Sequence, residues 1–173
     1  MKKIIVLLVV FSTLFAANAS AQFQGTFGMG AHANFGVEQH NFGVGLHIHY
    51  YMTNSLRLAP SATFFLPPSA VFFLSENEEQ ENSRAWKAEL DIHVVAPLSF
   101  STVVYPIIGA SYTNLRLDDI SAENGTQHRF GGNFGVGIQH DIVYRLRVNF
   151  EIKYHMIPDR SQVGLMVGIG FWI

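Results

Sequence analysis

Histidines are the residues of this chain whose type and spacing first suggest chemistry. Eight are present, and the chain has no cysteine. His47 and His49 stand two positions apart, so in a strand their imidazoles would point the same way and could share a metal ion. His93 belongs to a later segment, and no fixed metal-ligand motif accompanies the three residues. We therefore favour a hydrogen-bonded polar network over a metal centre, and we assign no metal ligand and no cofactor.

A second combination, His155, Asp159 and Ser161, contains the residue types of a serine hydrolase. Such an enzyme needs its base within hydrogen-bond reach of the serine hydroxyl, and spacing in the sequence does not establish that distance. Ordinary loop composition accounts for the same three residues. We predict no enzymatic activity and no catalytic residue, and we keep a lipid-modifying hydrolase as the weakest alternative.

Composition restricts the class of protein. A chain of 173 residues has room for one domain. Hydrophobic residues make up 49% and charged residues only 14%. Beyond the N-terminal region, however, no stretch reaches the roughly 20 uninterrupted apolar residues that a spanning helix needs. The lack of cysteine excludes disulfides and thiol catalysis. With 11 basic against 13 acidic residues, nothing indicates nucleic-acid binding.

Residues 1–21 have the composition of a secretory signal peptide. Lys2 and Lys3 form a basic region, Ile4–Ala17 an apolar run, and Ala19–Ala21 a cleavage site of small residues. We predict cleavage after Ala21 and a mature domain of residues 22–173. An uncleaved membrane anchor is the alternative, and the short apolar run disfavours it.

From residue 25 onward, bulky apolar residues alternate with small or polar ones in eight segments. Each segment has about the ~9–11 residues that a tilted membrane strand requires. The last segment shows the pattern most clearly, because Val163, Leu165 and Val167 share one face while Gly164 and Gly168 share the other. A period of two over so many segments predicts β-strands throughout.

A steric argument decides which face of these strands is inside. An eight-stranded barrel has an interior only just wide enough for side chains to fill, so bulky residues at every inward position would not fit. Small and polar residues therefore point inward, and bulky residues point outward into lipid. Strands cross hydrocarbon only as a closed barrel, because each unpaired backbone group there costs several kcal/mol. We predict an all-β fold, an eight-stranded antiparallel up-and-down transmembrane β-barrel, with a soluble lipocalin-like or sandwich fold as the alternative.

The inward face carries charges of both signs. We predict a polar network in the lumen that consists of Arg57, Lys87, Glu89, Asp91, His93, Arg145, Arg147, Glu151 and Lys153. Its basic and acidic members nearly balance when Asp141 is added. Paired charges in a closed lumen form a plug rather than a selective pore.

The lengths of the connections orient the barrel. The second, fourth and sixth connections are short, the sixth at residues 141–144, whereas the third (residues 67–83) and the fifth (residues 116–128) are long and acidic. Outer-membrane barrels have short periplasmic turns and longer external loops, so we expect the N-terminus on the periplasmic side.

The third connection combines carboxylates with an apolar stretch. Glu76, Glu78, Glu79 and Glu81 follow Val71–Leu74. Three interpretations stay open. The flanking strands could extend above the membrane and offer an edge and an apolar tip to a partner. Divalent cations could bridge the carboxylates to lipopolysaccharide. The third interpretation is a solvated loop.

Two strands carry a family resemblance. Tyr105–Tyr112 is similar to a Pro-aromatic-x-Gly-Ala-Gly strand, with Ile107 and Ser111 in place of an aromatic residue and a glycine. Leu146–Tyr154 is similar to a strand that bears an inward glutamate, here Glu151. Both resemble the small eight-stranded outer-membrane barrels of the OmpA/OmpX type, grouped as the outer-membrane protein beta-barrel domain family.

The C-terminus resembles the signal that the barrel-insertion machinery reads in this family. Gly168, Phe171 and Ile173 match it, whereas Met166 replaces a usual polar residue and Ile173 a common terminal aromatic residue. The resemblance implies a bacterial outer-membrane protein, integral and exported, that contacts outer-membrane lipid and lipopolysaccharide and meets the insertion machinery during assembly. It specifies architecture rather than activity.

We therefore expect a monomeric barrel with a plugged lumen and a structural or adhesion/interaction role at the cell surface. The alternative is a subunit of an envelope secretion or assembly complex, similar to the PorT-like barrels of the same family group.

Overall fold

The computed structural model describes residues 24–38, 40–66, 84–116, 126–157 and 161–173. These residues form eight long strands and one short strand, β5 (Ala96–Pro97). The long strands are β1 (Phe27–Gly36), β2 (Asn41–Tyr51), β3 (Leu56–Leu66), β4 (Arg84–Val94), β6 (Thr102–Arg116), β7 (Thr126–Val143), β8 (Leu146–Met156) and β9 (Gln162–Trp172). No helix in the described part of the chain is long and apolar enough to span a membrane.

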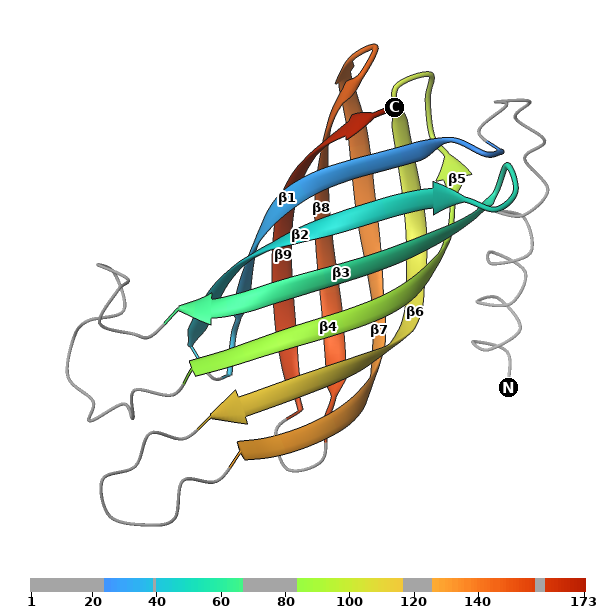
Figure 1. The fold of residues 1–173 in the computed structure, drawn as a ribbon. Helices are drawn as coiled ribbons and strands as arrows, with labels where there is room; N and C mark the ends of the chain where they lie inside the picture. Colours follow the sequence, from blue (N-terminus) through green and yellow to red (C-terminus); the bar gives the residue numbers. More distant parts are fainter. Residues whose placement is uncertain (1–23, 39, 67–83, 117–125, 158–160) are drawn as a thin grey trace, which may run out of the picture.

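The long strands form one closed antiparallel sheet (Figure 1). Strands that follow one another in the chain are paired, and the β1–β9 ladder, with Ala31 opposite Ile169, joins the two ends of the chain. Although β5 lies between β4 and β6 in the chain, β4 pairs directly with β6, with Leu90 opposite Ala110. Strand β5 contributes only two residues, which pair with β6. The eight-stranded antiparallel up-and-down barrel predicted from the sequence is confirmed. A closed sheet has no free edge to expose to hydrocarbon.

Side chains alternate between the lumen and the outer surface, as the period of two predicts. In β8, Glu151 and Lys153 are each 2% exposed, whereas Ile152 between them is 42% exposed. In β2, His47 is 4% exposed and its neighbour Leu46 is 68% exposed. The outer surface is thus apolar and the interior is polar, which is the reverse of a water-soluble barrel and suits a lipid surrounding.

Glycines on the inner face leave room for large side chains in the lumen. A Cβ atom at Gly137 would overlap the ring of Tyr105, and one at Gly168 would overlap the side-chain amide of Asn149. The interior of an eight-stranded barrel is narrow, so a large inward residue needs a small one opposite. The structure therefore supports the steric argument that placed the bulky residues outside.

The two ends of the barrel differ. At one end, which we call the short-turn end, lie the turn between β2 and β3 (residues 52–55), the connection that contains β5, and the turn between β7 and β8 (residues 144–145). At the other end, the long-loop end, β3 connects to β4 and β6 to β7 through segments 67–83 and 117–125, which lie outside the described residues. Glu76, Glu78, Glu79 and Glu81 belong to the first of these segments.

Several strand boundaries differ from the expectation. Residues 126–128, placed in a loop by their polar composition, belong to β7. The β7–β8 turn was expected at residues 141–144. It falls at residues 144–145 because β7 continues to Val143, with a register irregularity between Asp141 and Val143. Pro60 lies inside β3. Its ladder to β2 lacks partners at Ala59 and Pro60, while the ladder to β4 continues, as expected for a residue without an N–H group.

Candidate functional site: a charged network in the lumen

Lys153 of β8 is the centre of an ion network that crosses the lumen. Its ammonium group lies 2.9 Å from Oδ2 of Asp91 and 3.2 Å from Oε2 of Glu89, both on β4. The carboxylate of Glu151 is 3.7 Å away, and Lys87 contacts the other oxygen of Glu89 at 3.3 Å. The side chains of these five residues are at most 2% exposed. Ions buried this deeply are stable only when they are paired and hydrogen-bonded.

Neighbouring polar groups complete the bonding of these carboxylates. The side-chain amide of Asn133 donates to Oε1 of Glu89 at 3.0 Å and to Oδ1 of Asp91 at 2.9 Å. Its carbonyl oxygen accepts from Nδ1 of His155 at 3.0 Å. A neutral His155 ring that donates through Nδ1 has a lone pair at Nε2, and this nitrogen lies 3.3 Å from Nζ of Lys87. One tautomer of His155 therefore satisfies both contacts.

Arg57 connects the network to the short-turn end. Its guanidinium donates to Nδ1 of His93 at 2.8 and 3.1 Å and to Oε1 of Gln139 at 2.6 Å. The same group lies 4.3 Å from the centre of the Tyr105 ring, a cation–π distance. The hydroxyl of Tyr105 donates to Oε1 of Glu151 at 2.9 Å. Arg57 and Glu151 are thus joined through one aromatic side chain.

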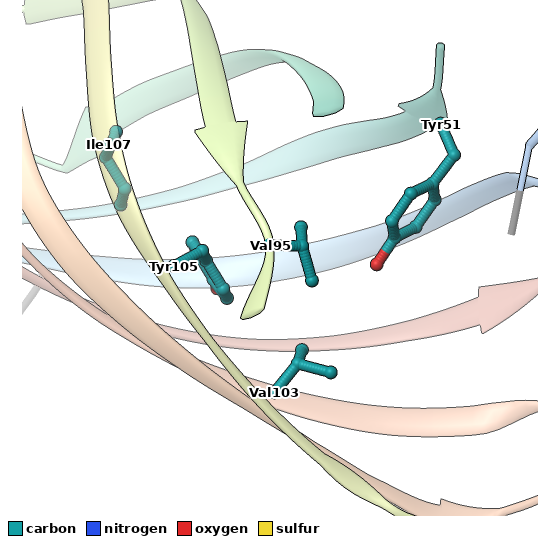
Figure 2. Packing of buried hydrophobic residues seen from close by; sticks show 5 residues of the cluster. All are labelled: Tyr51, Val95, Val103, Tyr105 and Ile107. Carbon is teal, nitrogen blue, oxygen red and sulfur yellow. The ribbon is translucent and has the colours of Figure 1, made fainter. Parts of the chain in front are cut away.

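An apolar cluster lies at the short-turn end of the lumen. It consists of Tyr51, Val95, Val103, Tyr105 and Ile107, and Figure 2 shows these side chains gathered between the strands. All are at most 8% exposed, and the partly buried Trp172 packs against them. The ring of Tyr51 lies 5.3 Å from that of Trp172. The lumen is therefore occupied by charges along its length and by apolar groups at this end.

The structure places eight of the nine predicted network residues inside the barrel. Arg57, Lys87, Glu89, Asp91, His93, Arg147, Glu151 and Lys153 are each at most 5% exposed. Arg145 is the exception and corrects the prediction, because it lies exposed in the β7–β8 turn. The longer β7 moves the turn along the chain, so Arg145 falls beyond the end of the barrel.

Several residues of the network were not selected from the sequence. Asn133, His155 and Gln139 each bond to a charged side chain, and His32 accepts or donates a 2.9 Å bond with Thr63. The signal for them is the same alternation that identified the charged residues, because each occupies an inward position of its strand. Amide and imidazole groups satisfy buried charges without carrying a full charge of their own.

The three histidines considered for a metal site do come together. The ring centres of His47 and His49 are 4.7 Å apart, and those of His49 and His93 are 5.8 Å apart. Although β3 separates β2 from β4 in the sheet, the curvature of the barrel brings their inward side chains into contact. His49, His93 and Glu151 form a group in the described lumen whose ligand atoms could hold a metal ion.

The hydrolase combination is not assembled in the described residues. His155 is buried and bonds to Asn133 and Lys87, whereas Ser161 is exposed and donates to the backbone carbonyl of Ile157 at 3.2 Å. Asp159 lies outside the described residues. The side chains of His155 and Ser161 therefore bond to different groups and not to each other.

The outer surface carries aromatic residues near the long-loop end. The rings of Trp86 and Tyr112 lie 5.4 Å apart, and those of Tyr112 and Phe130 lie 5.1 Å apart. Phe171 of β9 and the terminal residue Ile173 are exposed, while Gly168 and Met166 of β9 face the lumen. Aromatic groups at the ends of an apolar band are typical of barrels in membranes.

The family model described as the outer membrane protein beta-barrel domain matches residues 5–171. The chain belongs to this outer-membrane β-barrel family. Its membership, together with the apolar outer surface, assigns the protein to the bacterial outer membrane. No curated protein has a matching sequence.

Solved structures with a similar fold are small outer-membrane barrels. The N-terminal β-barrel domain of Pseudomonas aeruginosa OprF is 15% identical, with a TM-score of 0.65 over 87% of this chain and 98% of that one. Neisserial surface protein A is 12% identical, with a TM-score of 0.64 over 86% and 97%. Ail, the attachment invasion locus protein of Yersinia pestis, is 13% identical, with a TM-score of 0.61 over 87% and 99%. Identities this low relate the folds alone.

Proposed function

We propose that this outer-membrane barrel has a plugged lumen and acts at the cell surface as a structural or adhesion protein. The observation that carries the proposal is the filling of the lumen. The charged network crosses it from β8 to β4, and the apolar cluster with Trp172 occupies the short-turn end. A continuous water column needs a path lined by solvated groups, and these side chains are buried against one another instead.

The long-loop end supports a role in contacts with other molecules. The β6–β7 ladder reaches Thr126, whereas the β7–β8 ladder begins only at Gly132, so the β6–β7 hairpin projects past β8 (Figure 1). Phe130 on this hairpin is 74% exposed. A projecting strand can accept an added strand from a partner, and an exposed aromatic side chain can anchor it. The similar barrel Ail is named for attachment and invasion, which agrees with such a role.

Planar-bilayer recording tests the plug. We expect the purified barrel to form no stable ohmic channel. A variant with Tyr51→Ala and Tyr105→Ala serves as the positive control, because removal of two rings from the apolar cluster should produce a measurable leak. Stable channels from the unaltered protein would contradict the plug.

Pull-down from native outer membranes tests the contact role. Wild-type protein is compared with a variant in which residues 117–125 are replaced by a short turn and with a variant that lacks residues 77–82. We expect loss of bound partner in the first variant. Recovery of the same stable set of envelope proteins with all three forms would favour the alternative, a subunit of a secretion or assembly complex similar to the PorT-like barrels.

The route to the membrane is also part of the proposal. Residues 1–21 serve as the cleaved signal, and the C-terminal strand with Phe171 and Ile173 is read by the insertion machinery before the barrel contacts lipid and lipopolysaccharide. We further propose that the protein is not an enzyme. N-terminal sequencing of protein from outer membranes should begin at Gln22, and a chain that starts at Met1 would overturn the cleavage.

A further inference from the structure

Three buried side chains from three different strands face one point in the lumen. His49 of β2, His93 of β4 and Glu151 of β8 each bring one ligand atom to within 4.8 Å of the others. All three residues are at most 2% exposed. Ligand atoms on one tetrahedral zinc ion stand roughly 3.3 Å apart, since zinc–nitrogen and zinc–oxygen bonds are about 2.0–2.2 Å. Small side-chain rotations would close the remaining gap.

A cavity beside these groups is the second observation. It has a volume of about 10 Å³ and is lined by His47, His49, His93, Glu151 and Met166, among others. This is roughly the smallest space that holds one water-sized sphere. Among the described residues, Nε2 of His93 and both ring nitrogens of His47 are buried without a hydrogen-bond partner. Each such nitrogen costs free energy unless a group in the cavity bonds to it: an N–H nitrogen needs an acceptor such as water, and a lone-pair nitrogen can bind a donor or a metal ion.

The ligand types fit a transition-metal ion. Two imidazoles and one carboxylate form a set that zinc favours, and a fourth position is available to a water molecule or to His47. Met166 lies directly opposite Glu151 in the β8–β9 ladder, so its thioether borders the same space. A polar residue is usual at that position of the family's C-terminal strand, and here an apolar, polarisable side chain borders the cavity instead.

Arg57 disfavours binding of a cation at this site, so a substitution of Arg57 should change the affinity for the ion. Its guanidinium donates to Nδ1 of His93, which places the ring proton of a neutral His93 on Nε2. To bind the ion through Nε2, His93 must carry this proton on Nδ1 instead, and the hydrogen bonds from Arg57 are then lost. The guanidinium also brings a positive charge close to the site, as does the ammonium group of Lys153, which lines the same cavity and lies 3.7 Å from the carboxylate of Glu151. Glu151 has the opposite effect, because its carboxylate offsets part of the charge of the ion.

We propose that the lumen of this barrel binds one zinc ion through His49, His93 and Glu151. The sequence favoured a hydrogen-bonded network because His93 belongs to a different strand from His47 and His49, with one strand between them, and because no fixed metal-ligand motif is present. The closed barrel removes the first of these objections, because it brings His49 and His93 together. The competing occupant is a single ordered water molecule, which would satisfy the same nitrogens without a metal.

The experiment uses the whole barrel, purified in detergent, stripped with a chelator and titrated with Zn²⁺ against a chromophoric chelator. We expect one Zn²⁺ per chain, and binding at least ten-fold weaker in His49→Gln and in Glu151→Gln, since both remove a ligand. Arg57→Gln should bind more tightly than wild type. His140→Gln is the matched control, because His140 is exposed and bonds to Thr102 away from the site.

Folding of each variant is verified by its shifted mobility in unheated detergent gels, and Co²⁺ serves as a second probe. We expect visible absorption from tetrahedral Co²⁺ in the wild-type barrel and its loss in His49→Gln. The proposal is overturned if Zn²⁺ does not bind, as expected for a water-filled cavity. It is overturned equally if His49→Gln and His140→Gln weaken binding to the same extent.

Discussion

Around Lys153 the lumen is filled by charges, whereas at the short-turn end it is filled by hydrocarbon and aromatic rings. In the first region, Lys153, Glu89 and Asp91 depend on one another, because the loss of Lys153 would leave Asp91 without its cation and Glu89 with Lys87 alone. In the second, Val95, Val103 and Ile107 contribute through contact area, and the loss of one leaves a cavity but no stranded charge. The comparison shows that the charged region is stable only when every ion keeps its partners, whereas the apolar region can lose one side chain and keep the contacts among the others.

Tyr105 belongs to both regions. Its ring packs in the apolar cluster and lies under the guanidinium of Arg57, while its hydroxyl bonds to Glu151. The charged region and the apolar cluster therefore meet at Tyr105. Substitutions of this residue separate the contribution of the ion network to stability from that of apolar packing.

The largest effect is expected at the centre of the ion network. Lys153→Met should lower the free energy of unfolding by about 3–5 kcal/mol, because Glu89 and Asp91 lose their shared cation in a buried site. Urea unfolding in lipid vesicles, followed by the fluorescence of Trp86 and Trp172, measures it. Adding Asp91→Asn should restore part of the loss. A change below about 1 kcal/mol would mean that water reaches these carboxylates.

A smaller effect is expected in the apolar cluster, where Ile107 can be compared with its chain neighbour Ile108, which lies outside the cluster. Ile107 is 3% exposed in the lumen and Ile108 is 52% exposed on the outer surface. Both Ile→Ala changes lose apolar transfer free energy. Ile107→Ala should cost about 1–2 kcal/mol more, because lipid chains fill the space at Ile108 but the rigid lumen keeps a cavity. Equal losses in the same unfolding assay would show that the cluster can collapse or admit water.

The smallest effect is expected at the boundary. Tyr105→Phe keeps the ring in the cluster and removes only the hydroxyl bonded to Glu151, so it should cost about 1 kcal/mol. The measurement is again urea unfolding, with Tyr112→Phe as the control because Tyr112 lies on the outer surface. A loss as large as that of Lys153→Met would place Tyr105 inside the ion network rather than at its border.

Much of this site could be predicted from the sequence, and the failures are informative. The alternation Glu151–Ile152–Lys153 assigns faces correctly because a strand turns successive side chains to opposite sides. The predicted inward position of Arg145 is wrong because a register irregularity near Asp141 shifts the turn, and the alternation of residue types does not reveal such irregularities. The extension of β7 to Thr126 was missed because its residues are polar, although pairing with β6 makes them a strand.

The sequence by itself determined which face of each long strand is inward, that the long strands number eight, and that the bulky face is outside. These follow from a period of two and from the narrow interior of a small barrel. Only the tertiary structure decided which inward residues meet. Lys153 of β8 reaches Glu89 and Asp91 of β4, and His49 reaches His93 and Glu151, although none of these contacts joins neighbouring strands. Contacts across the lumen depend on how the closed sheet is staggered around its axis, and no local pattern in the chain encodes that stagger.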